Sequence, residues 1–299
     1  MRTLVTGVTG QLGYDVVREL NAKGHNFIYA PTRREMNLCD EESIRSTMES
    51  YKPDVVFHCA AYTAVDKAEN DVDTATIVNV DSTRIIAQEC KKIGAKLIYV
   101  STDYVFDGTK PLDEVYEVTD KTNPKNVYGL TKLMGEKTAL SYNPKTFVAR
   151  TSWVFGINGN NFPKTMFNLS DRFSELKVVA DQFGSPTYSV DLAKTLVEMA
   201  ETDKYGLYHV NNEGYCSWAE FADTVMKIND RNTIITPVTT EEYYAGKDMS
   251  KIAYRPRNSK LSKKSLTSAG FNLLPTWQDA LERYFDEFDR KRLVLKLNV

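Results

Sequence analysis

Short apolar runs alternate with longer amphipathic stretches along the first half of the chain, and this alternation restricts the fold more than any other feature. The apolar runs are rich in β-branched residues, as strands are, and span Thr3–Thr6, Phe27–Ala30, Val55–Cys59, Lys96–Ser101 and Thr146–Arg150. The stretches between them have helical periodicity and span Gly13–Lys23, Glu41–Tyr51, Val72–Ile93 and Gly129–Leu140. This order predicts an α/β fold, a doubly wound parallel sheet with helices on both faces.

The pattern changes after Trp153. A run of glycine and asparagine at Gly156–Asn161 predicts an irregular loop, whereas Gly206–Val210 predicts a strand that returns to the sheet. With about 150 residues to a domain, the chain of 299 residues is long enough for two. We expect one domain from residues 1–153 plus about 189–212, and a smaller, discontinuous C-terminal domain from about 154–188 plus 213–299. In the second of these domains, apolar residues alternate along Arg290–Val299, and this pattern predicts a tail or a strand.

Charge and cysteine usage argue against several classes of partner. The 38 Lys and Arg residues nearly balance the 40 Asp and Glu residues, so nothing attracts the whole chain to nucleic acid or to an anionic membrane. Cys39, Cys59, Cys90 and Cys216 form no C-x-x-C pair, which favours free thiols and the cytoplasm. We expect no signal peptide and no membrane span, and the three histidines lack the spacing of metal ligands.

Three glycines, Gly7, Gly10 and Gly13, follow the first predicted strand and open the first predicted helix. Glycine lets backbone N–H groups approach a phosphate closely, and the N-terminus of a helix favours an anion. The G-x-x-G-x-x-G spacing therefore predicts the phosphate site of a dinucleotide in a Rossmann-type sheet. The alternative is that these glycines only serve the geometry of a turn.

The second predicted strand is followed by Arg33 and Arg34. In a Rossmann-type sheet this strand ends near the adenosine ribose, where an acidic residue accepts the ribose hydroxyls of NAD. Guanidinium groups at this place suit a 2′-phosphate instead, so the sequence favours NADPH over NADH. Two solvated surface arginines are the alternative.

Tyr128 and Lys132 lie one helical turn apart in a predicted helix and so share one of its faces. A phenol becomes an acid–base group at neutral pH when a nearby cation stabilises its phenolate, and Lys132 supplies a cation. The spacing alone also fits a half-buried tyrosine beside an ordinary surface lysine. Thr102, at the end of the fourth predicted strand, places a hydroxyl at the same edge of the sheet.

Together these residues resemble the extended short-chain dehydrogenase/reductase family, and finer motifs resemble its dTDP-4-dehydrorhamnose reductases. The finer motifs cover essentially the whole chain and are Ala60–Glu69, Ser101–Phe106, Val127–Gly129, Arg150–Val154, Gly159–Phe162, Asp181–Thr187 and Arg255–Ser259. The resemblance implies reduction of the C4 ketone of dTDP-4-dehydro-L-rhamnose to dTDP-L-rhamnose by hydride from NADPH or NADH. This reaction is the last step of dTDP-L-rhamnose biosynthesis.

The resemblance also implies roles for single residues. Tyr128 protonates the forming alkoxide, Lys132 holds the nicotinamide ribose and lowers the pKa of Tyr128, and Thr102 hydrogen-bonds the carbonyl oxygen. Further implied cofactor contacts are Gln11, Leu12, Asn37, Leu38, Ala61, Tyr62 and Thr63. Implied substrate contacts are Thr102, Asp103, Tyr104, Trp153, and Arg255 or Arg257 at the pyrophosphate. The first domain then binds the dinucleotide, and the second binds the substrate.

Some neighbouring residues have plainer interpretations. Asp66, Lys67 and Glu69 are interpreted as a solvated helix entrance. Asn79 either orients Lys132 through a water molecule or satisfies backbone groups.

Some relatives dimerise through a carboxylate-bound Mg²⁺. Here Asp15 is the only matching acid and Val190 stands at another expected position, so no metal ligand is assigned, and a homodimer is left open.

Two other functions stay open from the sequence. The first is a nucleotide-sugar dehydratase or epimerase. Dehydratases of this kind carry a glutamate where this chain has Tyr104, and a phenol cannot take over the proton chemistry of that carboxylate. The second is a non-catalytic NADP-binding regulatory subunit that resembles the one of methionine adenosyltransferase. Turnover of a substrate would exclude this second function.

Overall fold

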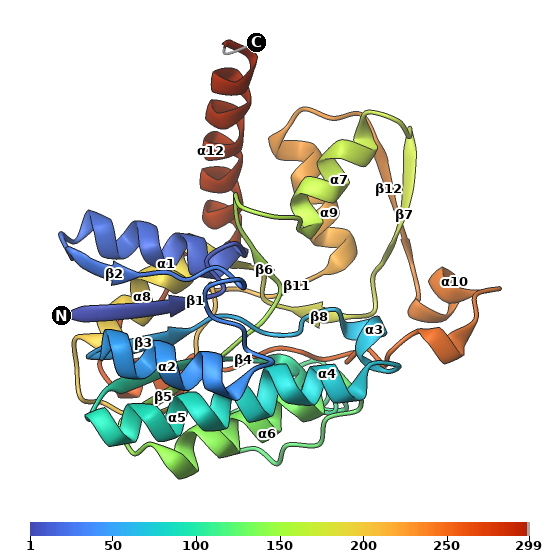
Figure 1. Ribbon diagram of the computed structural model, residues 1–299. Coiled ribbons are helices and arrows are strands. Elements are labelled where there is room, and N and C mark those ends of the chain that lie inside the picture. Colours follow the sequence, from blue (N-terminus) through green and yellow to red (C-terminus); the bar gives the residue numbers. More distant parts are fainter. Residues whose placement is uncertain (298–299) are drawn as a thin grey trace.

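A six-stranded parallel sheet forms the centre of the molecule, with the strand order β10-β5-β4-β3-β1-β2 (Figure 1). The structure is a computed structural model and describes residues 1–297. The strands are β1 (Arg2–Thr6), β2 (Phe27–Tyr29), β3 (Val55–His58), β4 (Lys96–Thr102), β5 (Thr146–Thr151) and β10 (Gly206–His209). The strand order reverses between β1 and β3, as in a doubly wound sheet, and the predicted α/β Rossmann-type fold is confirmed.

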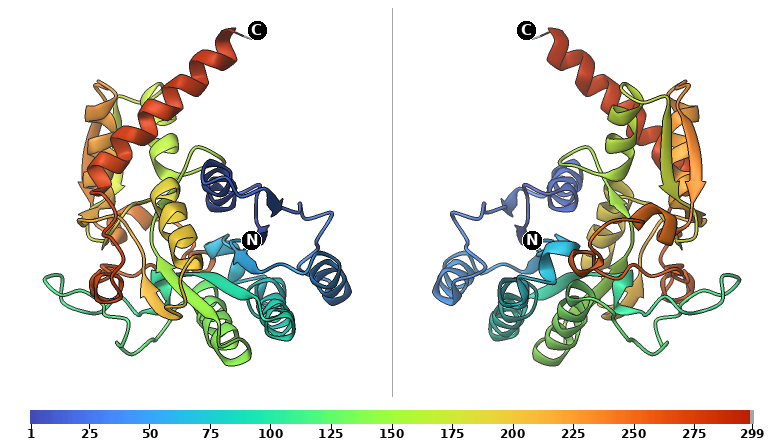
Figure 2. Two further views of the ribbon diagram at one scale, coloured as in Figure 1. Left: turned by 90° about the vertical axis from the view of Figure 1, so that its left-hand side faces the viewer. Right: turned by 90° about the vertical axis from the view of Figure 1, so that its right-hand side faces the viewer.

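Helices cover both faces of this sheet (Figure 2). They are α1 (Gln11–Ala22) and α8 (Ser189–Ala200) on one face, and α2 (Glu41–Tyr51), α5 (Ser82–Ile93) and α6 (Val127–Tyr142) on the other. Alternate strand residues point to opposite faces: Ile98 packs in the core with α1 and α8, whereas its neighbours Leu97 and Tyr99 pack in the core with α2, α5 and α6. Both faces of the sheet are therefore buried.

The predicted elements of the first half agree with the structure to within two residues at most ends, and α2 has the predicted bounds. One predicted helix, Val72–Ile93, is built from three consecutive segments. They are α4 (Val72–Thr76), a π-helical turn η1 (Ile77–Asp81) and α5. Such turns insert one extra residue in the hydrogen-bond ladder and are frequent at functional sites.

The rest of the chain adds short paired strands and helices. The strands β6 (Val154–Phe155), β7 (Glu175–Val179), β8 (Phe183–Gly184), β9 (Thr187–Tyr188), β11 (Cys216–Ser217) and β12 (Ile234–Val238) pair as β6 with β9, β7 with β12 and β8 with β11. The helices are α3 (Val65–Ala68), α7 (Phe162–Ser170), α9 (Trp218–Ile228), α10 (Thr240–Tyr244), α11 (Lys264–Ser268) and α12 (Trp277–Leu297), with 3₁₀ turns η2 (Asp103–Val105) and η3 (Met249–Lys251).

The expected tail or strand at Arg290–Val299 is wrong for the residues that the structure describes. Residues 290–297 continue α12, which projects from the body of the molecule (Figure 2), and residues 298 and 299 lie outside the described chain. Aromatic side chains hold the first half of this helix: Tyr284, Phe285 and Phe288 are buried in a core that also contains Phe155 and Phe221. This burial favours a helix over an extended segment, because it aligns the aromatic residues on one face.

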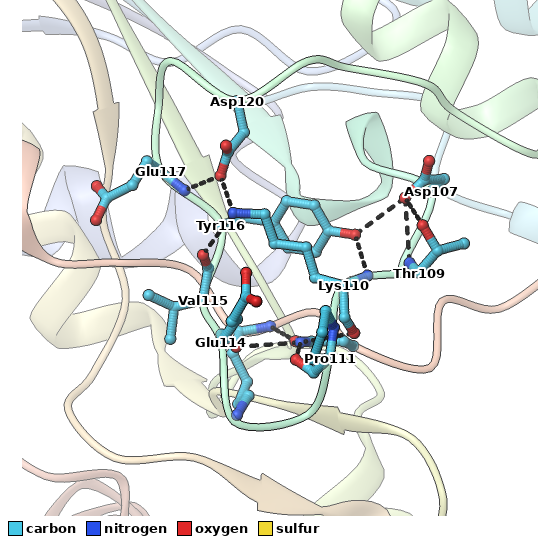
Figure 3. A network of polar contacts seen from close by, with 11 residues as sticks. Asp107, Thr109, Lys110, Pro111, Glu114, Val115, Tyr116, Glu117 and Asp120 are labelled. Carbon is cyan, nitrogen blue, oxygen red and sulfur yellow. Dashed lines mark hydrogen bonds and ion pairs between the residues drawn. The ribbon is translucent and has the colours of Figure 1, made fainter.

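A loop after β4 supports the segment that follows η3. Tyr116 stabilises this loop: its hydroxyl lies 3.0 Å from an oxygen of Asp107 and accepts a 3.2 Å hydrogen bond from the backbone of Lys110 (Figure 3). Lys110 in turn pairs with Asp120 at 2.6 Å. The amide of Asn258 donates to the backbone carbonyls of this loop, to Pro111 at 2.8 Å among others. Residues 253–260, which we name the strap, are thereby fixed against the loop after β4.

Within residues 1–297, no helix combines the length and the apolar character needed to cross a membrane. All four cysteines are free thiols.

Candidate active site

A cleft of about 910 Å³ lies at the carboxyl ends of the central strands. Ligands of open α/β sheets bind at this edge, near the place where the strand order reverses. Most of the site residues predicted from the sequence line the cleft: Gly7, Gly10, Gln11, Leu12, Gly13, Arg33, Asn37, Leu38, Ala61, Tyr62, Thr63, Thr102, Asp103, Tyr104, Tyr128, Lys132 and Trp153. Their binding and catalytic roles stay predictions.

The glycine turn forms one end of the cleft. Gly7 has a left-handed backbone with a φ of 72°, and a methyl group there would meet the backbone of Ala60 at 2.7 Å. A methyl group at Gly13 would likewise press on the turn, 2.9 Å from the nitrogen of Val8. Helix α1 begins after Gly10, which offers no side chain to cap it. The first N–H groups of α1 are therefore left for an anion.

Side chains from the second half of the chain brace this turn. Gln11 donates to the carbonyl of Val154 at 3.3 Å and accepts from Asn161 at 3.0 Å. Asn158 donates to the carbonyls of Thr9 and Gly10 at 3.0 and 3.1 Å. The predicted loop at residues 156–161 thus contacts the glycine turn through hydrogen bonds.

Arg33, Asn37 and Leu38 line the cleft after β2, whereas Arg34 is not among the lining residues. Arg33 is exposed and belongs to no ion pair with the described residues. Asn37 accepts a 3.1 Å hydrogen bond from the backbone of Cys39. The guanidinium expected at the 2′-phosphate is therefore free to contact a ligand in the cleft.

Tyr62 fixes the wall of the cleft after β3. Its backbone N–H donates to Asn79 at 2.8 Å, and its hydroxyl donates to Asp71 at 2.9 Å. The Asn79 amide also donates to Thr131 at 3.0 Å. This buried asparagine of η1 satisfies backbone groups of the wall, as the second interpretation expects, and a contact with Lys132 through water stays a prediction.

Tyr128 and Lys132 lie on one face of α6 and line the cleft with Thr102 at the end of β4. Asn126 begins the helix by accepting a 2.7 Å hydrogen bond from Gly129. Gly129 packs so closely on the backbone of Tyr104 that no larger residue fits there. This close approach sets the helix against η2 and brings the phenol of Tyr128 to the hydroxyl of Thr102.

The expectation that Lys132 lowers the pKa of Tyr128 stays a prediction, because Lys132 is not among the groups that shift this pKa in the described chain. Burial raises the pKa of Tyr128 to about 12, the Thr102 hydroxyl opposes the rise, and Asp103 adds to it. The Lys132 ammonium instead lies over the ring of Tyr99, 4.1 Å from the ring centroid. Burial also lowers the pKa of Lys132 to about 7. The phenol is therefore held in its neutral, proton-donating form.

Asp103 is a buried carboxyl next to these groups. It accepts hydrogen bonds from the hydroxyls of Thr102, at 2.9 Å, and of Ser259 on the strap. Burial raises the pKa of Asp103 to about 6 even though both hydroxyls favour its ionised form. A carboxyl with a pKa near neutrality inside a cleft marks this end as a candidate for substrate recognition.

Two tryptophans form the far end of the cleft. Trp153 has a left-handed backbone with a φ of 49°, which is rare for a bulky residue and typical of functional sites. Its ring stacks on that of Trp218 with 3.6 Å between the centroids. No sequence motif connects Trp218 with the cleft, because only the tertiary fold brings the start of α9 to the end of β5.

Arg255 and Arg257 do not line the cleft. Arg255 forms an ion pair with Asp66 at 2.9 Å, and Arg257 is exposed. The interpretation of Asp66 and Glu69 as merely solvated is wrong: Asp66 also accepts from the backbone of Ala253, and Glu69 accepts from the backbone of Val127 at 2.8 Å. Lys67 lines the cleft, and its interpretation as a solvated residue stays a prediction.

Asp15 is buried beneath the glycine turn, outside the cleft. It pairs with Arg18 at 2.9 Å and accepts a hydrogen bond from Ser189, and burial raises its pKa. Arg18 also pairs with Glu287 of α12 at 2.9 Å. In the part of the chain that the structure describes, no three His, Cys, Asp or Glu side chains are grouped to hold a metal ion.

The fold and the cleft define the class of the protein. A Rossmann-type sheet with a glycine turn after β1 and a Tyr-x-x-x-Lys pair on the helix beside β4 is the architecture of the extended short-chain dehydrogenases/reductases. Solved structures at low identity show the same fold: the UDP-glucose 4-epimerase of Thermus thermophilus, in complex with NAD, has a TM-score of 0.79 at 20% identity, and the match covers 97% of this chain and 99% of that chain.

Within this class the chain belongs to the family described as the RmlD substrate binding domain, whose model matches residues 1–290. The spore coat polysaccharide biosynthesis protein SpsK of Bacillus subtilis (strain 168) is 40% identical, and the match covers 96% of this chain and 97% of the relative. A dTDP-4-dehydrorhamnose reductase of Aggregatibacter actinomycetemcomitans is 38% identical, over 94% of this chain and 97% of the relative.

A crystal structure of dTDP-4-dehydrorhamnose reductase from Bacillus anthracis str. Ames, in complex with NADP, is similar throughout. Its TM-score is 0.90 at 39% identity, and the match covers 96% of this chain and 99% of that chain. The predicted family membership is confirmed.

Proposed function

We propose that this chain reduces the C4 ketone of dTDP-4-dehydro-L-rhamnose to dTDP-L-rhamnose with NADPH as the hydride donor. The observation that carries the proposal is one cleft that joins a glycine turn to a neutral phenol and a lysine at the carboxyl edge of the sheet. Support comes from relatives named dTDP-4-dehydrorhamnose reductase at 35–38% identity over nearly their full length. The free thiols fit a cytoplasmic enzyme.

The cleft fits a dinucleotide. Gly7 and Gly13 leave no room for side chains at the turn, and α1 begins without a side-chain cap, so its N–H groups suit a pyrophosphate. Lys132 would contact the nicotinamide ribose, and Arg33 would contact a 2′-phosphate. When bound, NADPH supplies the hydride for the ketone carbon.

Protonation is the task of the protein. Reduction of a ketone leaves an alkoxide, which is a far stronger base than a phenolate, so a neutral phenol is the form that must be ready. Tyr128 is in that form at neutral pH, since burial raises its pKa to about 12. Thr102, whose hydroxyl lies beside Tyr128, is proposed to orient the carbonyl oxygen by a hydrogen bond, for which its proton turns from Asp103 to the substrate.

The sugar nucleotide is proposed to occupy the end of the cleft where Asp103, Tyr104 and Trp153 lie. Tyr104 packs edge-on against Tyr128, with 5.8 Å between the ring centroids, and so narrows the space above the phenol. A pyrophosphate contact of Arg255 or Arg257 stays a prediction, and for Arg255 it requires competition with Asp66.

We also propose the division into a dinucleotide-binding domain (residues 1–153 plus about 189–212) and a substrate-binding domain (about 154–188 plus 213–299). Its support is that β10 pairs with β5 and α8 packs on α1, whereas Phe155, Phe221 and Tyr284 belong to a separate core.

The decisive experiment is turnover. The purified protein is expected to oxidise NADPH only when dTDP-4-dehydro-L-rhamnose is present, and to release dTDP-L-rhamnose. Intact NADPH binding without turnover would contradict the proposal and favour a regulatory NADP-binding protein. NAD that copurifies tightly and is retained through the cycle would favour an epimerase.

A further inference from the structure

A second charged residue, Glu136, shares the face of α6 that carries Tyr128 and Lys132. Glu136 follows Lys132 by four residues, so its side chain lies one helical turn farther from the cleft. The Lys132 and Glu136 side chains are almost fully buried, with 2% exposure each. A buried carboxylate in this place is costly unless it is paired.

Arg150 of β5 is the partner of Glu136. Its Nε and Nη2 atoms donate to the two carboxylate oxygens at 2.8 and 2.7 Å, and the ring of Phe106 lies 5.1 Å from the guanidinium. The third nitrogen, Nη1, has no partner among the described atoms. The two-pronged contact stabilises the ionised form of Glu136 and fixes its orientation.

A buried ion pair of this kind is weak evidence for stability, because apolar side chains of similar volume often replace such a pair without loss. An orphaned Nη1 adds to its cost. The pair therefore calls for another explanation, and its position on the Lys132 face of α6 provides one.

Two buried carboxyls lie on this side of the molecule, Asp103 in the cleft and Glu136 on the Lys132 face of α6, and of these two only Glu136 is among the groups that act on the charge of Lys132. Burial raises the pKa of the Cys59 thiol to about 12 and lowers the pKa of His58 to about 3, so both are neutral near pH 7. The hydroxyl of Tyr99, on β4, also stays neutral, because burial raises its pKa. Tyr128, on α6 itself, is a neutral phenol. Glu136 has the largest effect among the groups that favour the charged form of Lys132.

We propose that the Glu136–Arg150 ion pair is a positioning device for Lys132, in which Arg150 holds the Glu136 carboxylate where it stabilises the ammonium form of Lys132 at neutral pH. This inference rests on the proposed function in one respect: the reductase needs the Lys132 cation in the cleft.

The test compares the wild type with Glu136→Gln. The Lys132 side chain is followed by NMR in lysine-labelled protein, with its signal identified by its loss in Lys132→Met. Loss of the carboxylate is expected to lower the pH at which half of Lys132 is charged by about one unit. NADPH oxidation at pH 7 with the dTDP-ketosugar is expected to fall about fivefold. The alkaline limb of its pH profile is expected to move to lower pH by about one unit.

Two further variants separate this effect from folding. Glu136→Gln/Arg150→Met removes both charges, so no buried guanidinium is left without its carboxylate, and it is expected to show a smaller NMR shift in the same direction, because removal of the Arg150 cation offsets part of the loss of the carboxylate. Glu89→Gln is the matched control, because Glu89 is also a buried carboxylate paired with an arginine, Arg45, but lies on α5. It is expected to leave the Lys132 titration and the pH profile unchanged.

An unchanged Lys132 titration in the folded double variant would overturn the inference and leave the pair a structural role only. The NMR titration needs no substrate, so a shifted Lys132 without any turnover supports the inference while it contradicts the proposed reductase.

Discussion

The rings of Trp153 and Trp218 stack nearly parallel at the end of the cleft, with an angle of 11° between their planes. Trp153 follows β5 and Trp218 begins α9, so the stack joins the sheet to the helical half of the molecule. Gly184 lies against Trp153, and a methyl group there would come within 2.7 Å of the indole. The two rings are thus a rigid, apolar wall on the side where the sugar nucleotide is proposed to bind.

Removal of half of this wall should weaken substrate binding selectively. Trp218→Ala is expected to raise the KM for the dTDP-ketosugar about fivefold, since an aromatic stack contributes about 1 kcal/mol beyond the area it buries. The Kd for NADPH should change less than about twofold, because the glycine turn is not affected. Steady-state kinetics and fluorescence titration measure the two quantities. Trp218→Phe keeps a ring in place, and an equal loss in this variant would contradict a stacking role.

Tyr128→Phe removes the proposed proton donor and keeps its ring. We expect kcat to fall between about 10² and 10⁴-fold, the usual contribution of general acid catalysis, with little change in the Kd for NADPH. Rapid-mixing measurements of NADPH oxidation give the first quantity and equilibrium titration gives the second. A variant that keeps most of its kcat would show that another group protonates the product.

Charge reversal at Arg33 tests the choice of cofactor. Hydrogen bonds to a charged group contribute about 1.5–3 kcal/mol, so Arg33→Glu is expected to reduce the preference for NADPH over NADH by about 10- to 100-fold. The ratio of kcat/KM for the two cofactors measures it. Arg34→Glu is the matched control, since Arg34 does not line the cleft. An unchanged ratio in Arg33→Glu would contradict a contact between Arg33 and the 2′-phosphate.

Asp103 makes stability depend on pH. Its pKa is raised in the folded chain from 3.8 to about 6, so the folded state binds more protons than the unfolded state between these values. Stability from this group is therefore present at low pH and is lost as the pH rises through this window. Asp103→Asn removes the effect, and its unfolding free energy relative to the wild type should rise by about 1 kcal/mol between pH 5 and pH 8. Urea unfolding at both pH values tests this, and a constant difference would contradict it.

Gly135 allows α6 to approach β4. A methyl group at this position would overlap the hydroxyl of Tyr99 and approach the carbonyl oxygen of Asn79 at 2.5 Å. Gly135→Ala is therefore expected to lower the unfolding free energy by about 2 kcal/mol, despite the better helix propensity of alanine. Lys137→Ala, at an exposed position of the same helix, should stay within about 0.5 kcal/mol of the wild type. Equal stability of both variants would contradict the close packing.

Periodicity predicted the sheet, most of its helices and the shared face of Tyr128 and Lys132, because these features follow from local spacing. It could not predict the pKa of Tyr128, because this pKa depends on how deeply tertiary packing buries the phenol and on how far the nearest cation lies from it. The sequence could not predict the contact of Trp218 with Trp153 or the Asp66–Arg255 ion pair for a related reason. The two residues of each pair are distant in sequence, and no motif links them. Glu136 could have been singled out by its four-residue spacing from Lys132, but only the register of β5 reveals Arg150.

The strap has a consequence for how the molecule is synthesised. Asp66 and Asp103 are made early, whereas Ala253 follows Asp66 by 187 residues and Ser259 follows Asp103 by 156 residues. A growing chain can pair β1, β3 and β4 long before it can satisfy these two carboxyls, because contacts across such a span form late. We expect the central sheet to acquire protection from amide exchange first on the ribosome, and the sugar end of the cleft to be completed only when the strap has emerged.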